Sequence, residues 1–195
     1  MVKYSKSCLE VDTNYNKGDY FMRNKREIKI YNVIFPIWML WIFPMTWIIV
    51  LPGNFIIDSA VILIALKLLK IDKKKLIYKK TILKVWIFGF ISDFIGGIIL
   101  ISSGFVNFSN SEVMREWWYK NIETPVFYNP FQSIYGFLWV TVAVIITSIF
   151  IYIFNLKISF KNLEIEESTK KKLALALAIF TAPILFYLPT SWFYY

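Results

Sequence analysis

The sequence alternates between long apolar runs and short polar segments. The apolar runs cover approximately residues 28–51, 54–70, 81–104, 133–156 and 173–190. A helix rises ~1.5 Å per residue, so about 20 predominantly apolar residues are needed to cross a bilayer. The pattern therefore predicts an all-α, polytopic membrane protein with five transmembrane helices.

Residues 1–27 are polar and of mixed charge, and we expect them to form a cytosolic tail ahead of a single transmembrane domain over residues 28–195. No cleavable signal peptide is expected, because the first hydrophobic run begins only near Ile28. The single cysteine, Cys8, lies in this tail, and the chain has no histidine. This composition argues against zinc sites, Cys/His catalysis and disulfides, and no metal or cofactor is predicted.

Proline and glycine divide the first two runs. Residues 51–54, Leu-Pro-Gly-Asn, are typical of a turn, and Asn54 is a good cap for the helix that follows. Pro36 and Pro44 each remove a backbone donor within the first run, so that helix is predicted to be kinked. The kink is either a hinge that lines a cavity or an instance of the ordinary tolerance of membrane helices for proline.

The segment 105–132 is predicted to lie outside the membrane without spanning it. Ser109 and Glu112 have the spacing of a capping box. Apolar residues follow at helical spacing: Met114, Trp117, Trp118 and Ile122. We expect a short amphipathic helix in the outer interface, serving as an interfacial anchor or as a lid over a cavity. Residues 125–130 are predicted to be extended.

Basic residues cluster beside the apolar runs. Seven lysines lie between Lys70 and Lys84 and five between Lys157 and Lys172, whereas the outer loop carries two basic residues against three glutamates. Because loops rich in lysine are retained in the cytosol, the pattern predicts a multi-pass protein of the cell membrane. Its N-terminus would be cytosolic and its C-terminus extracytosolic.

The composition agrees with a membrane location. Hydrophobic residues make up 57% of the chain, compared with about 45 to 50% in soluble domains. The 22 Lys and Arg residues exceed the 13 Asp and Glu residues, for a net charge of +9. These basic residues lie next to the apolar runs, which is not a nucleic-acid footprint. We expect the lysine loops to bind anionic lipid headgroups, and no nucleic acid.

Two aspartates interrupt the second and third apolar runs. An aspartate near the middle of a membrane costs ~2.5 to 3.5 kcal/mol, so it needs a partner or a purpose. Asp58 precedes Lys70 by twelve residues, and Asp93 follows Thr81 by twelve. Both aspartates are therefore predicted to lie about 18 Å from the shared turn, at one level of an antiparallel hairpin.

Two neighbouring carboxylates in a low dielectric do not both stay charged without a cation. Asp58 and Asp93 would share a proton, recruit a lysine, or bind Na⁺ or another hard cation with help from Asn54, Ser59 and Ser92. Three alternatives stay open. They are a protonated structural contact, contact with a partner subunit and, for Asp58, simple access to water.

Small residues mark two expected sites of close helix packing. The first is a glycine group that flanks Asp93: Gly89, Gly96 and Gly97. It is consistent with a close helix crossing or a small cavity. The second is an alanine group at four-residue spacing in the last run: Ala174, Ala178 and Ala182. These alanines let helices approach within the chain or across a dimer, although plain helix propensity explains them equally well.

The predicted function is a small transporter, or the membrane subunit of a transport complex, whose carboxylate site handles a proton or a cation. Five spans without an evident inverted repeat are few for a transporter monomer, so a homo-oligomer or a partner membrane subunit is expected. The alternative is a non-catalytic assembly, immunity or sensory protein that acts through partner helices. An enzyme is not expected, because residues 91–97 lack the Gly-x-Gly-Asp arrangement of an intramembrane aspartyl protease and no P-loop is present.

Overall fold

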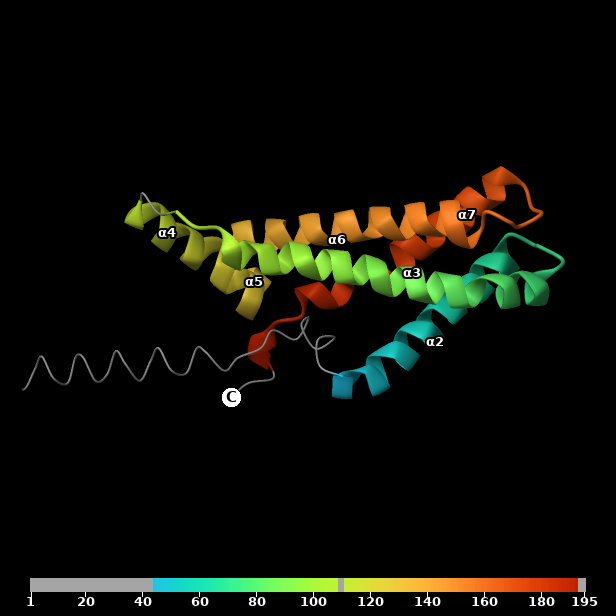
Figure 1. Ribbon diagram of the computed structural model, residues 1–195, viewed down its shortest axis with the longest axis horizontal. Coiled ribbons are helices and arrows are strands. Elements are labelled where there is room, and N and C mark those ends of the chain that lie inside the picture. Colours follow the sequence, from blue (N-terminus) through green and yellow to red (C-terminus); the bar gives the residue numbers. More distant parts are fainter. Residues whose placement is uncertain (1–43, 109–110, 193–195) are drawn as a thin grey trace, which may run out of the picture. The chain divides into compact units, whose positions relative to one another are not determined.

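The computed structural model describes residues 44–108 and 111–192, and throughout this part the regular elements are helices, without a strand. The principal helices are α2 (Pro44–Leu68), α3 (Lys74–Ser102), α6 (Ile134–Phe154) and α7 (Glu167–Phe180) (Figure 1). Helix α3 packs against α2 and α6, and α7 also packs against α2 and α6. The all-α prediction is therefore confirmed for the described residues.

Three helical segments are long and apolar enough to cross a membrane: Trp47–Leu68, Lys74–Phe105 and Ile134–Ser159. They correspond to the second, third and fourth predicted spans. Most of the first predicted span, residues 28–51, lies outside the described residues, as does the N-terminal tail.

The predicted turn at residues 51–54 is wrong, because α2 continues through these residues without a break. Asn54 is therefore an interior residue of α2 and not a helix cap. A proline within a helix removes one backbone donor, here the one that would bond the carbonyl oxygen of Ile48. Trp86 of α3 donates from Nε1 to the carbonyl oxygen of Leu51 at 3.0 Å, which joins α3 to α2 beside Pro52.

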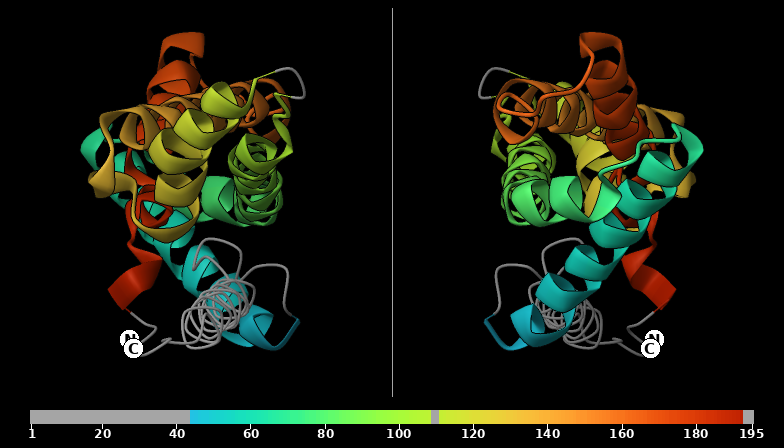
Figure 2. Two further views of the ribbon diagram at one scale, coloured as in Figure 1. Left: turned by 90° about the vertical axis from the view of Figure 1, so that its left-hand side faces the viewer. Right: turned by 90° about the vertical axis from the view of Figure 1, so that its right-hand side faces the viewer.

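Helix α3 begins at Lys74, seven residues before the predicted start at Thr81. The lysine-rich stretch is helical because lysine is a good helix former and long helices extend beyond the hydrocarbon layer. The connection from α2 is consequently short, and Lys70 within it has a positive φ of 52°. Seen along the long axis of α3, helix α2 runs at an angle to it (Figure 2).

The segment between α3 and α6 is helical for most of its length. It contains η2 (Ser103–Phe105), α4 (Glu112–Trp118), the π-helix η3 (Tyr119–Glu123), α5 (Thr124–Tyr128) and η4 (Pro130–Gln132). The cap of α4 is Ser111, whose side chain accepts from the backbone N–H of Met114, so the predicted capping box starting at Ser109 is wrong. Residues 125–128 are helical and not extended, with Pro125 in the first turn, where proline is well tolerated.

Tryptophan side chains join this outer segment to the long helices. Trp118 donates from Nε1 to the carbonyl oxygen of Ser103 at 2.8 Å and packs edge-on against Trp139 of α6. Trp139 in turn donates from Nε1 to the carbonyl oxygen of Ile99 in α3. The segment is thereby anchored to the protein. Its position at a membrane interface stays a prediction.

The last predicted span, residues 173–190, is not one continuous helix. Helix α7 starts at Glu167 and ends at Phe180, and two short 3₁₀ helices follow, η6 (Ile184–Tyr187) and η7 (Thr190–Trp192). The break coincides with Pro183, which cannot donate to the preceding turn and clashes with it.

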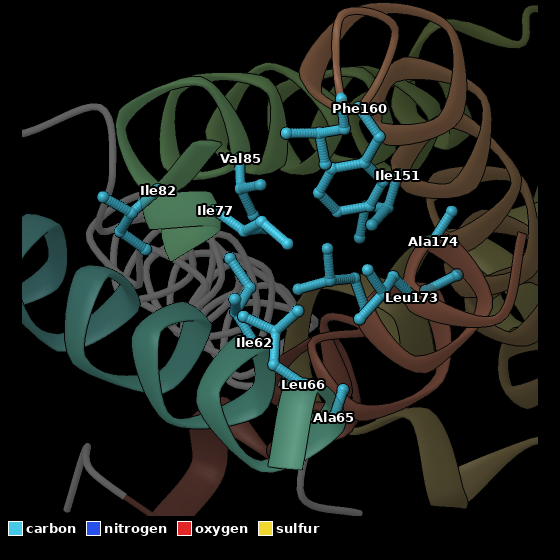
Figure 3. Packing of buried hydrophobic residues seen from close by; sticks show 13 residues of the cluster. Ile62, Ala65, Leu66, Ile77, Ile82, Val85, Ile151, Phe160, Leu173 and Ala174 are labelled. Atoms are coloured by element: carbon cyan, nitrogen blue, oxygen red, sulfur yellow. The ribbon is translucent and has the colours of Figure 1, made fainter. Parts of the chain in front are cut away.

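The main hydrophobic core lies where α2, α3, α6 and α7 converge, close to their lysine-rich connections. Figure 3 shows Leu66, Val85, Ile151 and Leu173, one from each helix, pointing toward a common centre. Each of these four side chains is at most 1% exposed. The antiparallel chain direction puts the α2–α3 and α6–α7 connections at the same end of the helices and the α4–α5 segment at the other end (Figure 1).

Candidate functional site: an acidic cavity between α2, α3 and the broken end of α7

A cavity of about 340 Å³ is enclosed by α2, α3, one residue of α6 and the chain that follows α7. Helix α2 contributes Val50, Asn54, Ile57 and Asp58. Helix α3 contributes Gly89, Phe90, Asp93 and Phe94. The remaining lining consists of Ile151 and residues 180–186. The three acidic and amide side chains of the lining all come from α2 and α3.

Helical spacing puts these residues on one face of each helix. On α2, Asn54 and Asp58 are four residues apart, and on α3 the pair Gly89 and Asp93 has the same spacing. Residues four apart on a helix are neighbours on its surface. The two aspartates therefore lie on the facing surfaces of α2 and α3.

The carboxyl group of Asp58 lies against α3. Its Oδ2 atom is 3.5 Å from the position that a Cβ on Gly89 would occupy, and the Asp58 residue is only 5% exposed. Gly89 is one helical turn before Asp93, which corresponds to a rise of ~6 Å. A Cβ at Gly89 would therefore be in ordinary van der Waals contact with the Asp58 carboxyl group, which places that group against this turn of α3.

The prediction that the two aspartates lie at one level of the hairpin stays a prediction. The Asp58 carboxyl group lies beside Gly89, one turn before Asp93 in α3, and both aspartates line the same cavity. Side chains lean toward the N-terminus of their own helix. In an antiparallel pair, the two side chains therefore lean in opposite directions along the helix pair.

One carboxyl oxygen of Asp93 has no hydrogen-bond partner among the described residues. Its Oδ1 atom is buried and has no partner within residues 44–108 and 111–192. The ion pairs in this part of the chain are Arg115–Glu112 and Lys170–Glu167, so no lysine neutralises either aspartate there. A buried carboxyl group left in this condition requires a proton, a cation or water.

Of the three residues predicted to assist the aspartates, one lines the cavity and two do not. Asn54 lines the cavity together with Asp58 and Asp93. Ser59 instead accepts a hydrogen bond from the hydroxyl of Tyr78 at 3.0 Å. Ser92 is fully buried and donates to the backbone carbonyl of Phe88 at 2.7 Å. Neither serine is among the lining residues.

Sequence reasoning missed the contribution of residues 180–186. Thr181 lines the cavity, and its hydroxyl donates to the carbonyl oxygen of Leu177. Pro183 was a usable signal, because it marks where the helix had to stop. Non-helical backbone is tolerated at membrane depth where it is buried in protein or lines a cavity.

Gly96 allows three elements to meet beside the cavity. A Cβ at this position would overlap Oγ1 of Thr147 in α6 and would lie 2.7 Å from a ring carbon of Phe186 in η6. Gly97 is also buried. The close approach of α3, α6 and η6 therefore depends on the missing side chain at Gly96.

The alanine group divides between core and cavity. Ala174 and Ala178 are buried in the main core, where α7 packs against α2 and α6 of the same chain. Ala182 lies beyond the end of α7 and lines the cavity. Ala174 and Ala178 therefore serve helix packing within the chain.

An all-helical architecture with three helices long and apolar enough to cross a bilayer indicates a helical membrane protein. Comparison with protein families, with characterised proteins and with solved structures finds no match to this chain.

Proposed function

We propose that this chain is a membrane transporter, or the membrane subunit of a transport complex, whose acidic cavity binds a proton or a cation. The observation that carries the proposal is the shared cavity of Asp58 and Asp93, in which Oδ1 of Asp93 has no partner among the described residues. Each aspartate would cost ~2.5 to 3.5 kcal/mol in hydrocarbon, and two nearby charges repel each other. A shared proton or a bound cation relieves both costs.

Other buried polar residues in the long helices support this interpretation over a purely structural contact. Thr81, Ser92 and Thr147 are fully buried, and each hydroxyl donates to the carbonyl oxygen four residues earlier in its own helix. This is how polar side chains are satisfied inside a membrane bundle. Asp93 differs from them because Oδ1 has no partner within the described part of the chain. Thr124, Asn155 and Ser159 also carry such an oxygen there, but they do not line the cavity.

The interrupted helix beside the aspartates is a second supporting feature. Secondary transporters bind ions and substrates at discontinuous helices, where unwound backbone faces the site. In this chain, residues 181–186 follow the end of α7 and line the same cavity as the two carboxyl groups. Such transporters contain more spans than the three described here, so we propose that the protein acts as a homo-oligomer or with a partner membrane subunit.

We further propose that the lysine-rich end of the helices faces the cytosol of a cell membrane and contacts anionic lipid headgroups. The α2–α3 and α6–α7 connections share this end, and most of the lysines of the described residues lie in or beside them. The opposite end carries Arg115 and Lys120 against three glutamates. This asymmetry supports the orientation through the retention of lysine-rich loops in the cytosol.

We expect no catalysis at this cavity. The chain has no histidine, and the lining residues include no cysteine, serine or lysine. Thr181 carries the only hydroxyl of the lining, and it donates to backbone and not to an acid. A nucleophile with an adjacent base is therefore missing from the lining.

The proposal is tested with purified protein in liposomes and in detergent. Proton flux and Na⁺-driven flux are measured for the wild type, Asp58→Asn and Asp93→Asn, with Glu123→Gln as the control acid outside the cavity. Stabilisation against heat by Na⁺ or by low pH is measured on the same variants, because binding is observable even if transport needs a partner. We expect each aspartate substitution to abolish ion flux and both kinds of stabilisation, and Glu123→Gln to retain ion flux and the stabilisation by Na⁺. Responses equal to those of the wild type in both aspartate variants would refute the proposed site.

A further inference from the structure

The cavity is much larger than an inorganic ion or a proton site needs. Its volume is about 340 Å³, compared with the ~30 Å³ that a water molecule occupies in the liquid. Pockets for small organic ligands measure ~300 to 1,000 Å³. The cavity is thus at the lower end of the range for organic molecules.

Polar side chains are also a minority of the lining. They belong to Asn54, Asp58, Asp93 and Thr181, and the other lining residues are apolar or glycine. A small inorganic ion would contact the oxygen atoms of these side chains and leave most of the apolar surface without an apolar partner. A cation that carries apolar groups would cover both parts of the surface.

Four phenylalanines are among the residues that line the cavity. Phenylalanine rings come from α3, from the end of α7 and from η6: Phe90, Phe94, Phe180 and Phe186. Aromatic rings attract organic cations through their negative faces, and quaternary ammonium groups are recognised in this way. A carboxyl pair and several phenylalanines in one cavity thus match a cation that carries apolar groups.

Polar and apolar side chains are distributed unequally around the cavity. Asn54, Asp58 and Asp93 all belong to α2 and α3, whereas residues 182–186 opposite the hairpin are Ala-Pro-Ile-Leu-Phe. A ligand with a cationic group and an apolar body fits this distribution, with the cation at the aspartates. An inorganic ion has no apolar part and does not match this distribution.

We propose that the cavity binds an organic ammonium cation carrying an apolar or aromatic body, in preference to Na⁺. The inference rests on the proposed function, because it specifies the class of cation for the same carboxylate site. The Asp58 and Asp93 carboxyl groups compensate the ligand charge, and the phenylalanines cover its apolar part.

The probe for this inference is radiolabelled benzyltrimethylammonium, measured by equilibrium dialysis with the full chain in a nonionic detergent. Neopentylbenzene is the matched competitor, because a carbon replaces the charged nitrogen at nearly the same shape. We expect saturable binding of the ammonium ion and at least tenfold weaker competition by neopentylbenzene and by Na⁺. Asp58→Asn and Asp93→Asn should each weaken binding at least tenfold, and Glu123→Gln should leave it unchanged.

A second variant tests the size of the ligand. Ala182→Leu adds three carbon atoms to the cavity wall and should weaken benzyltrimethylammonium at least tenfold. The same variant should keep the response to Na⁺ or low pH, which shows that it is folded. Equal binding of the probe to Ala182→Leu and the wild type would overturn the assignment to this cavity.

The outcomes separate this inference from the proposed function. Carboxylate-dependent responses to Na⁺ or protons without binding of benzyltrimethylammonium would overturn the inference and leave the function standing. Equal competition by neopentylbenzene, or binding that survives both asparagine substitutions, would show an apolar cavity of the kind that lipid fills and would also overturn it. Absence of every carboxylate-dependent response would overturn both.

Discussion

Replacing Gly96 by alanine tests how the cavity wall is held together. The added Cβ would overlap Oγ1 of Thr147 and would lie 2.7 Å from the ring of Phe186. Thr147 is fully buried, and its hydroxyl is bound to the carbonyl oxygen of Ala143 at 2.8 Å. Phe186 is 5% exposed and lines the cavity. Thr147 cannot move away without losing this hydrogen bond, so α3 must separate from α6, with Phe186 shifting into the cavity.

The expected cost follows from two opposing terms. Overpacking of a dense interior costs ~1 to 3 kcal/mol, whereas replacing glycine by alanine within a helix gains up to ~1 kcal/mol. Gly53→Ala isolates the second term, because a Cβ at Gly53 of α2 meets nothing within 4 Å. We expect Gly53→Ala to stabilise slightly and Gly96→Ala to destabilise by about 1 to 2 kcal/mol.

The assay is reversible unfolding in mixed micelles, with the free energy of unfolding compared among variants. A double-mutant cycle with Thr147→Ala identifies the clash, because removing the hydroxyl and methyl groups of Thr147 gives the new Cβ space. Gly96→Ala should then cost less in the Thr147→Ala background than in the wild type. Equal costs in the two backgrounds, or a Gly96→Ala variant as stable as Gly53→Ala, would refute the reasoning.

Three further predictions concern the topology, the outer segment and the contact between α2 and α3. In a cysteine-free background, a cysteine at Ser111 should react with an impermeant reagent from outside only, and one at Ser168 from inside only; the reverse pattern overturns the orientation. Burial raises the pKa of Glu123 above 4.5, so its contribution to stability is present below pH ~4.5 and is lost as pH rises through the raised value. Glu123→Gln should flatten this part of a pH–stability curve, and an unchanged curve contradicts the assignment. Trp86→Phe removes the hydrogen bond to the Leu51 carbonyl and should cost about 1 kcal/mol in the same unfolding assay; no loss would show that this bond does not hold α3 against α2.

Local pattern was a good guide to helices that are apolar for many residues. Residues 54–68, 81–102 and 134–154 were each predicted as helix and are helical in the structure, because an unbroken apolar run leaves the backbone no other way to satisfy its polar groups in hydrocarbon. Local pattern failed where proline occurs. Pro52 is accommodated inside α2, whereas Pro183 follows the end of α7.

The different outcomes at these two prolines have a tertiary cause. Beside Pro52, Trp86 of α3 donates to the carbonyl oxygen of Leu51, so α2 is held against α3 where the proline occurs. Thr181 is bonded back to its own helix, and beyond it the chain bends so that Phe186 packs against Gly96. Proline alone cannot distinguish these cases, because the deciding groups are distant in the chain.

The sequence by itself determined the helical class, three of the candidate spans and the clustering of lysine beside the apolar runs, because these depend on composition and on the length of each apolar run. It also determined that Asp93 and Gly89 share a helix face, since four-residue spacing is a local property. Only the tertiary structure decided that Asp58 lies against Gly89, that Ser59 and Ser92 have other partners, and that residues 180–186 line the cavity. Those contacts depend on the crossing of α2 over α3 and on the packing around Gly96, which no single segment encodes.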